Sequence, residues 1–192
     1  VGDVVGPLAR RLPEFRAVEH RILDAVAARF GVPRWQFEAH EVRHADAVVV
    51  AKDGLIYFSD ASQRFGPRDW GGTFEASVLD IMEQAATGRI LVYDVGMKTT
   101  KVVASGLSFA NGVAMSSDEK SIFVAETGKY RIWKVPVAAR NLDLSKGPAG
   151  GAAIVLGNLP GYPDNLMRGL PTADGKPKLW VGLTKPRNAL ID

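Results

Sequence analysis

The sequence predicts a mainly β fold: a partial β-propeller with two full antiparallel blades and part of a third, preceded by a short N-terminal α-helical segment. The first observation is a pattern that occurs three times, at residues 46–60, 111–127 and 164–184: an Asp or Asn, a short apolar strand, a polar turn and a second apolar strand. Asp-Gly between two apolar runs is a hairpin signal, and repeats of this size made of short strands are typical of propeller blades. The second observation is a change from helical to strand periodicity near residue 45.

The N-terminal segment, residues 1–43, has the periodicity of a helix. Apolar residues recur every three or four positions between Pro13 and Phe30. Pro13 suits the first turn of a helix, and Gly31 suits the position just after its end. We therefore expect a helix from Pro13 to Phe30.

From residue 46 onward, short apolar runs with strand periodicity follow one another. Strands are expected at residues 48–50, 55–58, 89–93, 100–104, 122–125, 131–137 and 153–156, with further strands opening at Asn111 and Asp164. Between them, residues 61–88 form an excursion with a helical turn near Leu79 to Ala85. Residues 138–151, rich in Gly, Pro and Asn, are expected to form a loop.

Two four-stranded units and half of a third do not close a propeller ring. Open sheet edges are templates for pairing with another chain. We therefore expect self-association through these edges. We also expect the chain, which begins at Val1 and stops at Asp192, to be a fragment.

The composition excludes several classes of function. The formal net charge is +3, and the basic residues are scattered among acidic ones, which does not favour nucleic-acid binding. The absence of cysteine excludes disulfides and thiolate metal sites. No apolar run reaches the roughly 18 residues needed to cross a bilayer, and no signal-peptide pattern is visible, so a cytoplasmic location is the default expectation.

Several motifs, in order, carry a resemblance over residues 44–192. They are ADAVVVAKDGLIYFSDASQRF at 45–65, GRILVYD at 88–94, FANGVA at 109–114, VAET at 124–127, YRI at 130–132, NLPGYPDN at 158–165 and LWVGLT at 179–184. This region resembles the strictosidine synthase-like family, which includes the animal adipocyte plasma membrane-associated proteins and is related to paraoxonases and gluconolactonases. The resemblance implies a six-bladed β-propeller, of which this chain covers roughly the middle half.

Residues 1–43 resemble a different family. VGDVVGPL at 1–8, LPEFRAVEHRI at 12–22 and AARFGVP at 27–33 are similar to the later helices of bacterial HD-domain nucleotide phosphohydrolases. That family's metal-binding His and His-Asp pair would lie before residue 1. Its last acidic ligand follows a pattern that VRHAD at 42–46 also fits, so Asp46 lies where the two resemblances meet.

The three openings of the repeat are candidate metal ligands. Corresponding positions of successive blades converge on the axis of a propeller, and oxygen ligands suit a hard cation such as Ca²⁺. The paraoxonase and gluconolactonase relatives bind a catalytic divalent metal in this way. The resemblance therefore implies that Asp46, Asn111, Asp164 and Asn165 hold Ca²⁺ or another divalent cation, without the first-blade Glu that those families add. The alternative is that these Asx residues only cap strands or form turns.

The histidines, His20, His40 and His44, all fall in the segment assigned to helix. His40 and His44 are four residues apart, a spacing that could bind a metal on a helix, but the Glu of a zincin motif is missing and we expect the two to be solvated. The propeller part would then have no histidine to act as a general base.

Other polar and aromatic positions have structural interpretations. Asp60 and Glu126 end equivalent strands, and we expect them to fix a turn or an arginine such as Arg131. Trp70 is expected either to shape a substrate mouth or to pack its own loop. Aromatic residues at strand positions are expected in the core between blades; they are Phe58, Phe123, Trp133 and Trp180.

The sequence thus predicts a truncated strictosidine synthase-like protein with a metal-dependent esterase or lactonase type of site, weak or inactive as it stands. Its substrate would be a small ester or lactone. One alternative is a non-catalytic binding or scaffold module, and another is the remnant of an HD-type phosphohydrolase.

Overall fold

The computed structural model describes residues 42–187, which form three antiparallel β units and one helix. The elements in chain order are β1 (Ala45–Val50), β2 (Ile56–Asp60), α2 (Thr73–Glu83), β3 (Gly88–Asp94), β4 (Thr99–Leu107), β5 (Ala110–Met115), β6 (Ser121–Glu126), η3 (Thr127–Lys129), β7 (Arg131–Pro136), β8 (Leu142–Asp143), β9 (Ala153–Leu156), β10 (Gly161–Gly169) and β11 (Lys178–Pro186). The expected helix from Pro13 to Phe30, with His20 and His40, lies outside the described residues.

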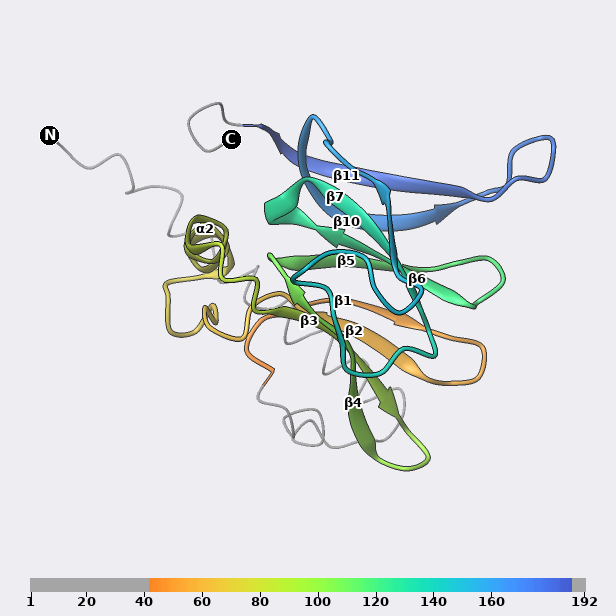
Figure 1. Cartoon of the computed structure of the whole chain (residues 1–192), viewed down its shortest axis with the longest axis horizontal. Coiled ribbons are helices and arrows are strands. Elements are labelled where there is room, and N and C mark those ends of the chain that lie inside the picture. The colour runs from red at the N-terminus through yellow and green to blue at the C-terminus, as the bar shows by residue number, and fades with distance from the viewer. Residues whose placement is uncertain (1–41, 188–192) are drawn as a thin grey trace, which may run out of the picture.

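The strands form three sheets that follow one another along the chain. The first sheet has the order β1-β2-β3-β4-β8, the second β5-β6-β7-β9, and the third is the hairpin β10-β11. The sheets are stacked in sequence order, and their first strands β1, β5 and β10 lie next to one another (Figure 1). This stack of consecutive sheets, of five, four and two strands, confirms the predicted fold class, a partial β-propeller of two blades and part of a third.

Two of the three buried clusters lie between sheets, and the third lies on β2 and β3 of the first sheet alone. The largest apolar cluster joins the first sheet to the second and includes Ile90, Leu107, Ile122 and Trp133, all fully buried. A smaller cluster joins the second sheet to the β10-β11 hairpin through residues such as Leu166. Because each interface is apolar, neighbouring units hold one another in place.

A buried carboxylate closes each of the first two units in the same way. Asp60, at the end of β2, forms an ion pair with Arg89 on β3. Glu126, at the end of β6, pairs with Arg131 on β7 and also accepts a hydrogen bond from the indole of Trp133. The predicted role of the two carboxylates is therefore confirmed, and it extends to the aromatic core.

Two details of the sequence prediction were wrong. The loop expected at 138–151 contains β8, which pairs in parallel with β4 through Ala104↔Leu142 and Ser105↔Asp143. Its neighbour Leu144 is fully buried and anchors it, but two residues are too short a strand to give a periodic signal. The helical turn expected near Leu79 to Ala85 is also longer and earlier, spanning Thr73–Glu83.

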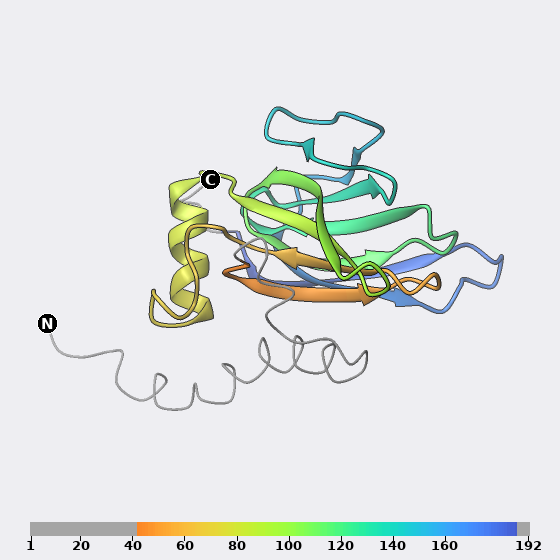
Figure 2. The same ribbon diagram turned by 90° about the horizontal axis from the view of Figure 1, so that it is seen from below.

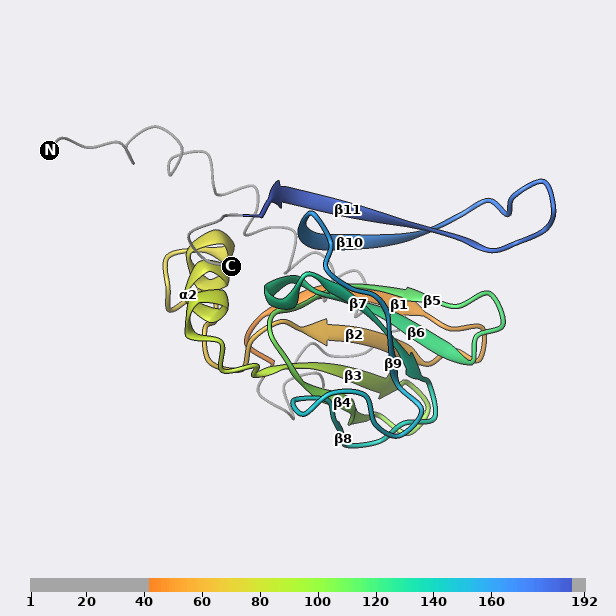
Figure 3. The ribbon, with the colours of Figure 1, turned by 45° about the horizontal axis from the view of Figure 1, so that its top comes forward.

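Trp180 was predicted to lie in the core, but its side chain is 56% exposed. Its neighbours Leu179 and Val181 pack towards the second sheet. Because side chains alternate along a strand, Trp180 points to the other face of the hairpin. Figure 3 shows that no further described strand covers that side of β10 and β11. Trp133, by contrast, is buried between the first two sheets as expected. Phe58 is buried in a cluster of the first sheet alone, and Phe123 is partly buried.

Candidate metal centre

Each first strand has an irregularity at the same place. The register of β1 against β2 shifts between Ala45 and Val48, that of β5 against β6 between Ala110 and Val113, and that of β10 against β11 between Pro163 and Leu166. A bulge re-aims the side chains next to it. The four candidate ligands lie within these three shifts; they are Asp46, Asn111, Asp164 and Asn165.

The second and third units bring two of these residues into contact. The amide of Asn111 donates a hydrogen bond to the carboxylate of Asp164, so the two side chains meet across β5 and β10. Asn111 is only 6% exposed, and its side-chain oxygen has no hydrogen-bond partner among residues 42–187. Burial raises the pKa of Asp164, and the hydrogen bond from Asn111 opposes that rise. A buried amide oxygen beside a carboxylate is a pair of hard oxygen ligands of the kind that Ca²⁺ takes.

Gly112 explains why β5 and β10 come so close. A Cβ at this position would lie 2.3 Å from the backbone oxygen of Asp164 and 2.7 Å from the backbone nitrogen of Leu166. Any larger residue would therefore push the two strands apart. The glycine directly after Asn111 sets the approach that places its amide against Asp164.

The other two candidates are less enclosed. Asp46 is half-buried at the start of β1, the strand adjacent to β5. Asn165 is exposed, although its backbone packs against Gly112. Among residues 42–187, no three His, Cys, Asp or Glu side chains come together as a metal-binding group. The described part of the chain thus offers two carboxylates and two amides at the equivalent bulges.

His44 was predicted to be a solvated helical residue, and this is wrong. It lies in the extended segment just before β1 and is completely buried. Its Nδ1 lies 3.1 Å from the backbone oxygen of Phe65, and its ring packs edge-on against Phe109 with the centroids 5.0 Å apart. Burial lowers the pKa of His44 to about 4. The β part of the chain therefore does contain a histidine, and the side chain is enclosed by neighbouring segments.

Trp70 packs its own loop. Its ring lies 5.2 Å from that of Phe65, with the two rings steeply inclined, and 45% of the side chain is exposed. Of the two roles considered for Trp70, the described contacts fit loop packing.

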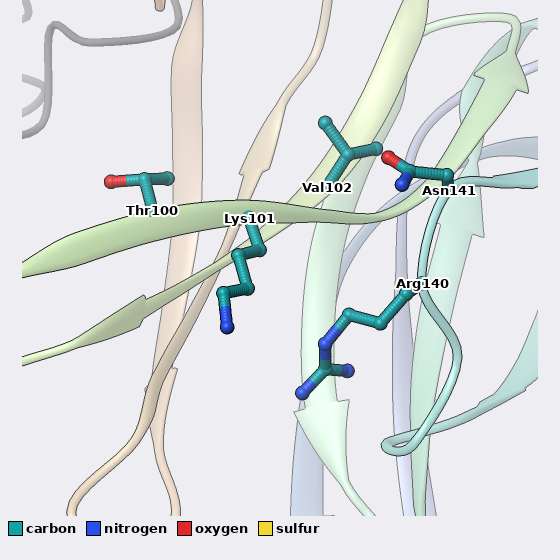
Figure 4. A pocket seen from close by; sticks show the side chains of 5 residues that line it. All are labelled: Thr100, Lys101, Val102, Arg140 and Asn141. Carbon is teal, nitrogen blue, oxygen red and sulfur yellow. The ribbon is translucent and has the colours of Figure 1, made fainter. Parts of the chain in front are cut away.

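A shallow cavity of about 380 Å³ lies elsewhere, against the outer strand β4. Figure 4 shows its lining side chains: Thr100, Lys101, Val102, Arg140 and Asn141. The guanidinium of Arg140 donates hydrogen bonds to the backbone oxygens of Val137 and Ala139, which commits it to its own loop. This cavity therefore does not belong to the site formed by β5 and β10.

Comparison with known proteins points to one family. Residues 46–139 match the sequence model of the strictosidine synthase family. The chain is 40% identical over 120 residues to the adipocyte plasma membrane-associated protein of Salmo salar and 35% identical over 138 residues to the strictosidine synthase-like 10 protein of Arabidopsis thaliana. These alignments cover 62% and 72% of this chain but only 26% and 32% of the two relatives, so the chain spans about a third of their length or less.

A solved structure of a luciferin-regenerating enzyme superposes with a TM-score of 0.47 at 21% identity, over 76% of this chain and 41% of that chain. None of the helices within residues 42–187 has both the length and the apolar character needed to span a membrane.

Proposed function

Because the strictosidine synthase family accounts for residues 46–139, we propose that the chain is part of a metal-dependent hydrolase of the esterase or lactonase type. The observation that carries the proposal is the pair Asn111 and Asp164 on adjacent first strands. A buried amide oxygen, which has no partner in the described part of the chain, lies there beside a half-buried carboxylate. This donor set fits a hard divalent cation. Asp46 and Asn165, at the equivalent bulges, would complete the part of the site that this chain supplies.

A cation held there would polarise the carbonyl of an ester or lactone and stabilise the charge that develops on its oxygen. The chain's own residues have a more limited task. Asp164 and Asn111 would fix the position of the cation, and the hydrogen bond between them orients both side chains. His44 is unsuited to take a proton from water, because it is fully buried and its lowered pKa makes the imidazole a weak base.

The chain is expected to be weak or inactive by itself. With two carboxylates it would bind Ca²⁺ weakly, because the number of charged ligands and the rigidity of the site set the affinity. A site open to water also stabilises an oxyanion poorly.

The test is hydrolysis of phenyl acetate and of a simple lactone by the purified chain, with Ca²⁺ and with EDTA. We expect a rate close to that of buffer alone. Strong turnover that EDTA and Asp164→Ala both abolish would show the hydrolase chemistry to be right and the expected inactivity wrong. Turnover that survives both treatments would contradict the metal's role.

A second candidate is a non-catalytic binding or scaffold module. It is favoured by the lack, within residues 42–187, of any group of three His, Cys, Asp or Glu side chains. The third, a remnant of an HD-type phosphohydrolase, rests on residues that are mostly outside the described range. Phosphatase assays with nucleoside monophosphates would test it.

A further inference from the structure

Helix α2 touches all three β units at one end of the molecule. Figure 2 shows the helix standing across the ends of the strands, and Figure 1 shows it at the end where β1, β5 and β10 begin. Its Glu83 pairs with Arg64, which follows β2, and the Lys129 amine in η3 donates to Gln84, directly after the helix. The amine of Lys185 on β11 lies 4.6 Å from the centre of the Phe74 ring. One helix thus links the first, second and third units.

The helix is not held there by an apolar face. It buries Ala76 and Asp80, whereas Phe74, Val78 and Met82 are 58%, 42% and 60% exposed. A surface helix of a globular protein normally buries its apolar residues against the core and exposes its charged and polar residues. With only a methyl group and a carboxylate fully buried, the position of α2 depends on polar contacts.

Asp80 is the centre of those contacts. Its side chain is fully buried, and its Oδ1 lies 3.4 Å from the hydroxyl of Thr87, the residue just before β3. The Ser62 hydroxyl lies 3.3 Å from that of Thr87. Burial raises the pKa of Asp80, while the nearby hydroxyls of Ser62 and Thr87 and the backbone N–H of Phe109 oppose the rise. One carboxylate therefore joins the helix to the segments before β3 and before β5.

Phe109 is the residue through which this network reaches the candidate metal centre. It has a positive φ of 56°, which is uncommon for a bulky side chain and persists only where its surroundings hold it. Its backbone oxygen accepts a hydrogen bond from Thr127, and its ring packs against His44. Asn111 lies two residues further along the chain.

We propose that Asp80 is a positioning residue: it fastens α2 as a lid over the opening ends of β1, β5 and β10, and it fixes Phe109 so that Asn111 faces Asp164. The lid and the anchoring of Phe109 stand on the contacts of Asp80 alone, whereas the consequence for a bound cation rests on the proposed function.

The test is amide hydrogen exchange of the full chain, without metal or substrate, in the wild type, Asp80→Ala and Asp80→Asn. Losing a hydrogen bond to a buried charged group costs enough to speed local exchange about tenfold. We expect Asp80→Ala to accelerate exchange by about this factor in α2 and at Phe109, while β6 and β7 keep their protection. Asp80→Asn, which has the same shape and still accepts from the hydroxyls, should restore most of the protection.

Glu83→Gln is the matched control, because Glu83 lies on the same helix and forms an ion pair at the surface with Arg64, whose side chain is 60% exposed. It should loosen the last turn of α2 and leave Phe109 unchanged. If Asp80→Ala does not fold, Asp80→Ser takes its place, since serine is polar but too short to reach Phe109.

Unchanged exchange at Phe109, or equal acceleration in β6 and β7, would overturn the proposal. Because no metal is present, this result is independent of whether the chain binds one. A Ca²⁺ titration of the same variants separates the two questions: if the metal proposal alone fails, Asp80→Ala still loosens Phe109 while no variant responds to Ca²⁺.

Discussion

At the scale of single residues, the burial of His44 makes stability depend on pH. Its pKa is lowered from 6.5 to about 4 in the folded chain, mainly by burial, so the unfolded chain binds the proton more tightly. Its contribution to stability is therefore fully present above pH 6.5 and is lost as the pH falls towards 4. A difference of this size corresponds to about 3 kcal/mol of unfolding free energy.

We expect urea unfolding of the wild type to show this loss between pH 7 and pH 4, and His44→Asn to lose about 3 kcal/mol less over the same range. Asparagine keeps a donor near the position of Nδ1 but does not titrate. The pKa values of three buried or half-buried carboxyl groups, Asp60, Asp80 and Asp164, are raised, so these groups add to the free energy of unfolding as the pH falls. Both proteins contain them, so their effect cancels in the comparison. Parallel pH curves for the two proteins would show that His44 is not the titrating group.

The sequence predicted some residues at this scale better than others. Asn111 and Asp164 lie together as predicted, because they open a repeated pattern and a repeat places equivalent residues side by side. His44 was misassigned because it stands next to a helical pattern, and no local signal marks a histidine that a strand and a loop enclose. Asp80 was missed because one acidic residue in an exposed-looking helix is ordinary, and only its complete burial distinguishes it.

At the scale of elements, the close crossing of β5 and β10 depends on Gly112. Gly112→Ala would place a methyl group at 2.3 Å from the Asp164 oxygen, so the strands must separate. Overpacking of this kind costs about 1–3 kcal/mol. We expect thermal unfolding at a lower temperature and loss of the contact between Asn111 and Asp164.

The control is Gly54→Ala, in the turn between β1 and β2. Its Cβ would have nothing within 4 Å, and the cost is limited to its positive φ of 86°. Chemical shifts of the Asn111 side-chain amide report the contact directly. If Gly112→Ala leaves these chemical shifts unchanged and Gly54→Ala alters them, close packing at β5 and β10 is not what positions Asn111.

Most elements were predictable, because the hairpins combine an apolar period of two with turn residues such as Asp53 and Gly54. The exceptions follow from tertiary contacts. β8 exists because Leu144 is buried beside β4, and α2 begins earlier than expected because its exposed apolar residues gave no amphipathic pattern to delimit it.

At the scale of the whole molecule, the outer face of the β10-β11 hairpin is exposed and apolar. Met167 and Trp180, which pair across the two strands, are 66% and 56% exposed. Contiguous apolar surface of this kind favours association. We expect the chain to self-associate at high concentration, with a mass from light scattering that rises with concentration.

The double variant Met167→Lys and Trp180→Lys should shift the chain towards the monomer. Met97→Lys, in the exposed turn between β3 and β4, is the matched control and should not. A concentration-independent monomer mass for the wild type would contradict the expectation.

The proposed function depends on Asn111 and Asp164 forming part of a divalent cation site. Its most direct test is the thermal unfolding temperature at increasing Ca²⁺, because a ligand that binds only the folded chain must stabilise it. At tenfold excess over a dissociation constant in the millimolar range, the gain is about 1.4 kcal/mol, or about 3–6 °C for a chain of this size.

The wild type should show this rise with Ca²⁺. Asp164→Ala and Asn111→Ala should not, while Asp174→Ala, an exposed carboxylate in the turn of the same hairpin, should behave as the wild type. No shift in the wild type at millimolar Ca²⁺, or an equal shift in Asp164→Ala, would contradict the account and favour the scaffold.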